Sequence, residues 1–319
     1  MKYIFGPVNS RRLGRSLGID LIPTRICSFD CIYCEVGAKR LITGVRKEYV
    51  PLPALLSEVD RFLTQPDAAE LFDLLTITAS GEPTLHTGIG RFIEALKKRS
   101  DKPVAVLTNG SLLSDPEVRR DLAAADLVIP SLDAARDESY QKVNRPHSDF
   151  PMERLIDGLV RFSKEYRGKL WLEILLVKGI NDLPADIAAL KGAIQRIRPQ
   201  KIQLNTVVRP PFEHSALPLT EEELHAIAGQ LGPTAEVITS FKGEGRKDFH
   251  PVDEEAIIAL IRRRPCPLED ISSALRYRPD RVGLALARLC LEKRATRRLH
   301  NGIPYYQVGE THKTEPSET

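Results

Sequence analysis

Short, continuously apolar runs alternate with longer amphipathic stretches through residues 15–240. Continuous apolar runs are typical of parallel strands covered on both faces, whereas apolar residues at three- and four-residue spacing indicate helices. The expected strands are Ser16–Ile22, Leu74–Thr78, Val104–Thr108, Leu127–Ser131, Leu170–Val177 and Lys201–Val207. The expected helices lie near residues 52–65, 88–98, 115–124, 153–166, 184–197 and 220–231.

Six strand–helix units in succession predict an α/β fold with a parallel sheet and right-handed crossovers. An open doubly wound sheet and a partial TIM-type barrel both accommodate six units. In either architecture, ligands bind at the carboxyl ends of the strands. Nearly every distinctive polar motif of the chain follows an expected strand directly, so the pattern favours an enzyme.

The pattern changes after residue 240. Three helices are expected near residues 253–263, 267–275 and 279–293, and two strands, Thr296–His300 and Ile303–Val308, flank Asn301-Gly302, the preferred pair for a type I′ turn. Three helices followed by a hairpin are the order of a winged helix. The expected segments are a core domain at 1–240, a polar, glycine-rich linker at 241–251, a winged-helix-like domain at 252–308 and a disordered tail at 309–319.

Composition adds two constraints. The 319 residues are 42% hydrophobic and 28% charged, with a formal net charge of +3, which is ordinary for a globular protein. The first residues lack the apolar core of a signal peptide, and the apolar runs are too short to cross a bilayer. We therefore expect a cytoplasmic protein with no membrane partner.

Three of the five cysteines fall within eight residues, in the loop Cys27-Ser-Phe-Asp-Cys31-Ile-Tyr-Cys34 that follows the first expected strand. An odd, clustered set is a poor disulfide framework and points to metal binding or catalysis. Thiolates at this spacing suit an iron–sulfur cluster or zinc. No other cysteine or histidine precedes residue 86, so a four-iron cube held here would keep one iron open, as a reactive site requires.

This cysteine spacing, with an aromatic residue before the last cysteine, resembles the radical S-adenosylmethionine (SAM) superfamily. Four further motifs follow successive strands in the order expected for that superfamily. They are Ser80-Gly81-Glu82-Pro83, Thr108-Asn109-Gly110, Ser131-Leu132-Asp133 and Lys178-Gly179-Ile180-Asn181-Asp182. The resemblance covers about residues 15–210. Alone, Gly-Glu-Pro and Thr-Asn-Gly are common turns. Their order after the cysteine loop is what supports the resemblance to the superfamily.

The resemblance implies that Cys27, Cys31 and Cys34 ligate one [4Fe–4S] cluster and that SAM chelates its open iron. An electron from the cluster then breaks the sulfur–C5′ bond of SAM, and the resulting 5′-deoxyadenosyl radical abstracts hydrogen from a substrate. The cofactors carry this chemistry, while the protein orients them and excludes water. A reductase, ferredoxin or flavodoxin is the expected electron donor.

The resemblance also implies roles in SAM binding. Gly81 and Glu82 are expected to meet the methionine amino group, Pro83 to fix that turn, and Tyr33 to pack near the adenine. Ser131 is a candidate donor to the SAM carboxylate, with a plain strand-end cap as the alternative. Two strand-end amides are weaker candidates for contact with SAM or substrate: Asn109 and Asn205.

The run from Phe5 to Asp20 and the segment Arg209-Pro-Pro211 indicate a narrower group within the superfamily. With the motifs above, they resemble stand-alone iron–sulfur oxidoreductases related to the wyosine-tRNA synthases, which implies a partial (β/α)6 barrel. Wyosine synthases carry further cysteines upstream for a second cluster, and this chain has none before Cys27. Molybdenum-cofactor enzymes need a downstream cysteine cluster, which Cys266 and Cys290 do not supply. We expect one cluster and transfer neither activity.

Two basic regions suggest a partner. Arg11, Arg12 and Arg15 either meet an anionic substrate at the open end of the barrel or pair with surface acids. Residues 260–302 contain eleven Lys/Arg against four Asp/Glu, a local net charge of +7. This charge predicts a nucleic-acid substrate such as RNA, with a solvated basic face as the alternative. A peptide substrate also stays open, because winged helices hold peptides as well. A different class of function, an iron–sulfur redox-sensing nucleic-acid-binding regulator, also fits a cluster joined to a basic winged helix.

Overall fold

A computed structural model describes residues 1–10, 12–37, 39–66, 68–238 and 251–308. The chain divides into two compact units, Met1–Gly243 and Glu244–Thr319. The expected linker, apart from residue 251, and the expected tail lie outside the described residues. No helix in the described ranges combines the length and apolarity needed to cross a bilayer.

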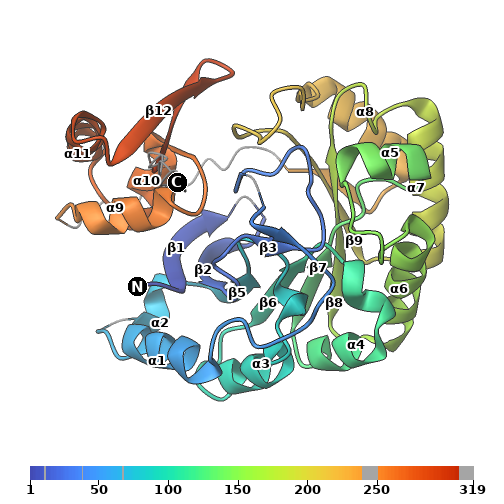
Figure 1. Ribbon diagram of the computed structural model, residues 1–319, viewed down its shortest axis with the longest axis horizontal. Helices are drawn as coiled ribbons and strands as arrows, with labels where there is room; N and C mark the ends of the chain where they lie inside the picture. Colours follow the sequence, from blue (N-terminus) through green and yellow to red (C-terminus); the bar gives the residue numbers. More distant parts are fainter. Residues whose placement is uncertain (11, 38, 67, 239–250, 309–319) are drawn as a thin grey trace, which may run out of the picture. The chain divides into compact units, whose positions relative to one another are not determined.

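The first unit is built on one eight-stranded sheet with the order β1-β2-β5-β6-β7-β8-β9-β10 (Figure 1). Every neighbouring pair is parallel except β1 with β2. The strands are β1 (Ile4–Ser10), β2 (Gly14–Asp20), β5 (Leu74–Thr78), β6 (Val104–Thr108), β7 (Leu127–Pro130), β8 (Lys169–Leu176), β9 (Lys201–Thr206) and β10 (Ala235–Val237). A separate parallel pair joins β3 (Ile26–Cys27) to β4 (Leu41–Ile42).

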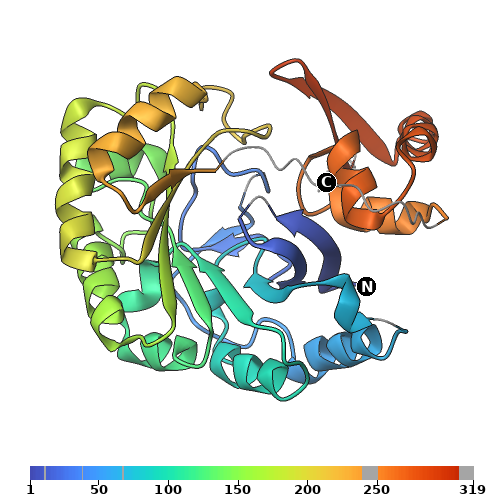
Figure 2. The ribbon, with the colours of Figure 1, turned by 180° about the vertical axis from the view of Figure 1, so that it is seen from behind.

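Helices cover the outer face of this curved sheet, as Figures 1 and 2 show from opposite sides. The α-helices of this unit are α1 (Leu52–Leu63), α2 (Ala68–Leu71), α3 (Ile89–Lys97), α4 (Pro116–Leu122), α5 (Asp137–Val143), α6 (Met152–Glu165), α7 (Pro184–Ile197) and α8 (Glu221–Leu231). Two short 3-10 helices are η1 (Pro83–Leu85) and η2 (Ser111–Ser114). The predicted α/β partial barrel is confirmed.

Alternate residues of each strand face opposite sides, so the sheet has two apolar layers. Ile202 and Leu204 of β9 are fully buried in the large core that also contains Ile187 and Leu190 of α7. A smaller cluster, with Leu127 and Ile129 of β7 among its members, lies on the other face. The inner face is therefore apolar at the amino ends of the strands, which leaves the carboxyl ends for polar motifs.

The hairpin of β1 and β2 was not predicted, because Gly6-Pro7 interrupts the first strand and is typical of a turn. The register of β1 against β2 shifts between Phe5 and Val8, so a bulge accommodates the interruption. Phe5 packs directly on Gly18, where an added Cβ would lie 2.2 Å from the ring. A larger residue at position 18 would displace this edge strand.

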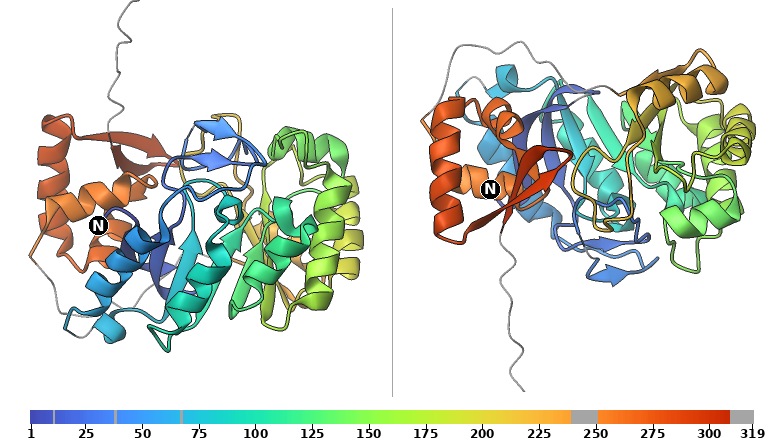
Figure 3. Two further views of the ribbon diagram at one scale, coloured as in Figure 1. Left: turned by 60° about the horizontal axis from the view of Figure 1, so that its bottom comes forward. Right: turned by 90° about the horizontal axis from the view of Figure 1, so that it is seen from above.

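The second unit contains α9 (Glu254–Ile261), α10 (Leu268–Leu275) and α11 (Pro279–Leu291) with a three-stranded sheet (Figure 3). That sheet has the order β11-β13-β12, formed by Cys266–Pro267, Ile303–Val308 and Ala295–His300 respectively. Asn301 and Gly302 both have positive φ, 49° and 76°, as a type I′ turn requires. The short β11 was not predicted; the assignment as a winged helix stays a prediction.

Candidate functional site

The cysteine loop begins at the end of β3 and is held at both ends by backbone hydrogen bonds. Thr43 donates its N–H to the carbonyl of Cys27 at 2.9 Å, and Phe212 donates to the carbonyl of Cys34 at 3.0 Å. Within the loop, the Cys34 N–H donates to the Cys31 carbonyl at 3.1 Å. Segments far apart in sequence therefore define where the three thiols lie.

The middle of the loop packs against the end of α5. Ile32 donates its N–H to Val143 O, and Asp30 donates to Asn144 O, each at 3.1 Å. The buried ring of Phe29 meets Tyr140 of α5 edge-on, with centroids 5.7 Å apart. This contact explains why an apolar residue stands between the first two cysteines.

Each of the three cysteine sulfurs accepts a hydrogen bond from a side-chain N–H. The bonds run from Asn109 Nδ2 to Cys27 Sγ at 3.6 Å, from Asn144 Nδ2 to Cys31 Sγ at 3.5 Å and from Lys39 Nζ to Cys34 Sγ at 2.9 Å. Donors of this kind stabilise sulfur that carries negative charge. Of these three residues, only Asn109 was a candidate from the sequence, and there for contact with SAM or substrate rather than with sulfur.

Burial favours the protonated form of two of the three thiols in the loop. Burial raises the pKa of Cys27 to about 12 and also raises the pKa of Cys31, so a bound metal must supply the charge that stabilises their thiolates. Among the described residues, no three His, Cys, Asp or Glu side chains are grouped to hold a metal ion.

The Gly-Glu-Pro motif lies against the backbone of the cysteine loop. An added Cβ on Gly81 would sit only 1.6 Å from the carbonyl oxygen of Ile26, the residue before Cys27. The next N–H, that of Glu82, donates to the same oxygen at 3.0 Å. Glycine is therefore required here for close backbone approach, a reason that the spacing of the motif could not reveal.

Glu82 is 1% exposed, and its carboxylate is surrounded by donors. Oε1 accepts from Thr84 N (3.0 Å), Thr84 Oγ1 (2.6 Å) and Thr108 Oγ1 (2.6 Å), and Oε2 accepts from Asn109 N (2.7 Å). Burial raises the pKa of Glu82, and these hydrogen bonds oppose the shift. Glu82 also caps η1, which Pro83 begins. The structure thus joins Gly81, Glu82, Pro83 and Asn109 to the loop that carries Cys27.

Tyr33 donates its hydroxyl to Asp133 Oδ2 at 2.5 Å. Asp133 is buried in the segment after β7, where Asn144 Nδ2 donates to Oδ2 at 2.7 Å and Leu175 N donates to Oδ1 at 2.9 Å. Burial raises the pKa of Asp133 to about 6, against these hydrogen bonds. The sequence included Asp133 in a motif without a role, and no signal in it identified Asn144.

The remaining predicted residues lie along the inner face of the sheet. Ser131, half-buried after β7, donates its backbone N–H to Thr108 O at 3.0 Å and forms a bridge with Glu173. Asn205 is buried on β9, with Nδ2 at 3.4 Å from Glu173 Oε1. Asn109 donates a second Nδ2 hydrogen to Ser28 Oγ at 2.9 Å. Ser131 and Asn205 therefore share Glu173 as a neighbour, whereas Asn109 contacts the cysteine loop.

Arg12 and Arg15 pair with different acids. Arg12 pairs with Glu173 on the inner face at 2.5 Å, while Arg15 pairs with Asp73 at 2.6 Å. Asp73 precedes β5, so Arg15 lies at the amino end of the strand, opposite the end that carries the motifs. For Arg15 the surface ion pair is the correct alternative; Arg11 lies outside the described residues.

Comparison with known proteins agrees with this geometry. A family model described as the Radical SAM superfamily matches residues 21–190, more than half of the chain. The chain belongs to the radical SAM superfamily, whose enzymes use a [4Fe–4S] cluster and S-adenosylmethionine. Within it the chain groups with the UPF0026 proteins: one from Methanocaldococcus jannaschii is 33% identical over 279 residues, 86% of each chain.

Two other similarities are more limited. A Brachyspira hyodysenteriae protein named GTPase Obg is 32% identical over 310 residues, 96% of this chain but only 45% of that protein. The present chain thus spans about half the length of that relative. The solved structure of TYW1 with a lysine-pyruvate adduct bound has a TM-score of 0.53 at 19% identity, covering 71% of this chain and 75% of that one. At that identity the likeness shows the fold.

Proposed function

We propose that this radical SAM enzyme holds one [4Fe–4S] cluster on Cys27, Cys31 and Cys34 and acts on RNA. When bound, the cluster and SAM supply reductive cleavage of SAM to a 5′-deoxyadenosyl radical, which abstracts hydrogen from the substrate. The observation that carries the proposal is the direct backbone contact between Gly81 and Ile26. It places the turn expected to bind SAM beside the first cysteine.

The side chains around the cysteines would bind and orient the cofactors. Glu82 Oε2 accepts one of the four hydrogen bonds to its carboxylate and retains capacity for an ammonium donor such as the methionine amino group. Tyr33, anchored through Asp133, would present its ring to the adenine. Ser131 would donate to the SAM carboxylate, and the buried Asn205 would contact SAM or the substrate from the inner face.

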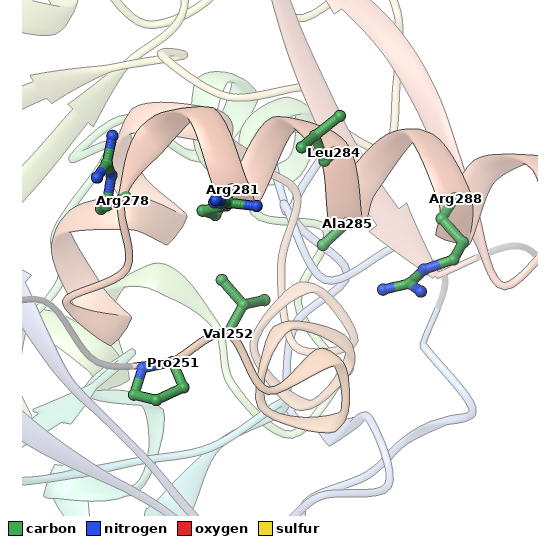
Figure 4. A pocket seen from close by; sticks show the side chains of 7 residues that line it. All are labelled: Pro251, Val252, Arg278, Arg281, Leu284, Ala285 and Arg288. Carbon is green, nitrogen blue, oxygen red and sulfur yellow. The ribbon is translucent and has the colours of Figure 1, made fainter.

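The choice of RNA rests on the second unit. Arg278 caps the start of helix α11, and Arg281 and Arg288 lie on it; their side chains are 62%, 66% and 64% exposed. They line a hollow of about 710 Å³ together with Pro251, Val252, Leu284 and Ala285 (Figure 4). The described residues that line the hollow include no acid, but Asp280 pairs with Arg278 and Arg281, and Glu254 pairs with Arg288. Guanidinium groups spaced along one helix suit a phosphate backbone.

Anaerobic reconstitution tests the chemistry. The protein is loaded with iron and sulfide, then given dithionite and SAM, and 5′-deoxyadenosine is measured. We expect it to form with the native protein and with Cys266→Ala, and not with Cys31→Ala, because two thiolates cannot hold the cube. Cluster assembly in the Cys31→Ala protein, or zinc in place of iron, would contradict the proposed ligand set.

RNA binding is tested by fluorescence anisotropy with bulk transfer RNA as the probe, between 50 and 200 mM salt. Replacing Arg281 and Arg288 by alanine should weaken binding and reduce the salt slope by about 1 for each lost phosphate contact. Arg161→Ala, an exposed arginine on α6, is the matched control. An equal loss of RNA affinity in the control variant would refute a specific RNA-binding surface on α11. Preferential binding of an acidic peptide would favour a peptide substrate.

The basic surface also favours a second candidate, an iron–sulfur redox-sensing regulator that binds nucleic acid. That function requires no SAM cleavage. It would be supported by duplex DNA binding that changes with the oxidation state of the cluster, in a protein that forms no 5′-deoxyadenosine under strong reduction. Formation of 5′-deoxyadenosine would favour the enzyme. A reductase, ferredoxin or flavodoxin remains our proposed electron donor.

A further inference from the structure

Each of the three sulfurs of the cysteine loop has its own N–H donor, and the donors come from three separate segments: the loop after the cysteines, the end of β6 and the end of α5. We propose that Lys39, Asn109 and Asn144 are positioning residues that raise the reduction potential of the cluster. This inference rests on the proposed cluster site and names the residues that regulate it. They act through the sulfurs and need not touch SAM or the substrate.

Lys39 carries the strongest of the three interactions. Its ammonium lies 2.9 Å from Cys34 Sγ, and the charged groups of the described residues that act on it are the cysteine thiolates rather than a carboxylate. The side chain is half-buried. Its positive charge is therefore directed at sulfur rather than neutralised by an acid, and partial burial strengthens the interaction relative to one in water.

The two asparagines are oriented by their other hydrogen bonds. Asn109 Oδ1 accepts from Ser111 N at 3.0 Å, so its amide nitrogen must face the loop, where it divides its two hydrogens between Ser28 Oγ and Cys27 Sγ. Asn144 divides its hydrogens between Asp133 Oδ2 and Cys31 Sγ. Reversing either amide would break these bonds, so both donors are held towards sulfur.

The direction of the effect follows from charge. One-electron reduction makes the cluster more negative by one charge, and donors to its thiolates stabilise the more negative state more strongly. All three residues therefore favour reduction, Lys39 most because it also carries a full charge. In the cell the proposed donor partner supplies the electron; in the test below dithionite supplies it.

The test is a potentiometric titration of the reconstituted full-length protein, followed by electron paramagnetic resonance. Lys39→Met removes the charge and donors at similar length, and Lys39→Arg keeps both. We expect Lys39→Met to reduce the ratio of reduced to oxidised cluster about tenfold at a fixed potential, a shift of about 59 mV for one electron. Lys39→Arg should stay near the native value. Lys98→Met, an exposed lysine after α3, controls for a remote charge.

The outcomes separate this inference from the proposed function. A native protein that binds no iron and sulfide refutes the cluster site itself. A native protein with a complete cluster, and a Lys39→Met variant with the same potential, refutes only the role of Lys39. If the Lys39→Met variant loses the cluster and the Lys39→Arg variant retains it, the result supports Lys39 as the donor to Cys34. Asn144→Ala, which should lower the potential by a smaller amount, provides an independent second variant.

Discussion

Replacing Gly81 by alanine tests the contact that unites the site. The new Cβ would stand 1.6 Å from Ile26 O and 2.5 Å from Ile26 C, whereas ordinary contacts begin at 3.4 Å. Both neighbours are backbone atoms, so no side-chain rotation can relieve the clash. Either the Gly-Glu-Pro turn or the strand that leads into Cys27 must move.

The magnitude follows from two terms. Forcing one carbon into a packed interior destabilises a protein by about 1–3 kcal/mol. Separating the two segments also breaks the hydrogen bond from Glu82 N to Ile26 O, worth about 1 kcal/mol. We therefore expect Gly81→Ala to lower the free energy of unfolding by about 3 kcal/mol and to reduce iron uptake, because Cys27 adjoins Ile26.

Urea unfolding of the apo-protein, followed by the fluorescence of Trp171, measures this loss. Trp171 is the sole tryptophan and lies on β8, so it reports the first unit alone. The matched control is Gly192→Ala on α7, where the new Cβ meets no atom within 4 Å. Alanine should stabilise that helix by up to about 1 kcal/mol. If Gly81→Ala unfolds at the native urea concentration and binds iron normally, the close approach is refuted.

Two further substitutions have defined outcomes. Glu82→Gln places an amide among the four donors to the carboxylate and should lower the free energy of unfolding by about 1–3 kcal/mol. It should also weaken SAM binding while iron uptake is retained. Unchanged SAM affinity by calorimetry would contradict the role of Glu82 in SAM binding. Arg15 lowers the pKa of Asp73 below its ordinary 3.8, so their surface pair stabilises the fold above that pH and is lost as pH falls through the lowered pKa. Asp73→Asn should therefore lower the free energy of unfolding by less than about 1 kcal/mol at pH 7, and the difference from the native protein should shrink below pH 3.8. A difference that stays constant across that pH range would contradict the pairing.

The sequence predicted the buried parallel strands well, because a strand covered on both faces must be apolar throughout. Expected and observed bounds coincide for Leu74–Thr78 and Val104–Thr108. It did not predict β1, whose Gly6-Pro7 interruption is absorbed by a bulge. The strands β3, β4, β10 and β11 have only two or three residues each, too few to show a period.

The site likewise has a part that the sequence could predict and a part that it could not. Cysteine spacing is local, so the sequence revealed the three thiols, but their donors reach them only through the folded chain. Lys39 lies just beyond the loop, whereas Asn144 stands 113 residues from Cys31 in a helix end without any motif. A pattern along the chain carries no information about such pairs.

The motifs that looked separate in sequence form one hydrogen-bonded unit. The backbone N–H of Asn109 binds Glu82 while its side chain binds Cys27, and the Glu82 N–H binds Ile26 O. Moving any member therefore changes the surroundings of the first thiol. In such a network the effects of single substitutions are coupled rather than additive. The contact between Gly81 and Ile26 thus has two consequences: it positions the turn expected to bind SAM and it holds the segment that presents Cys27.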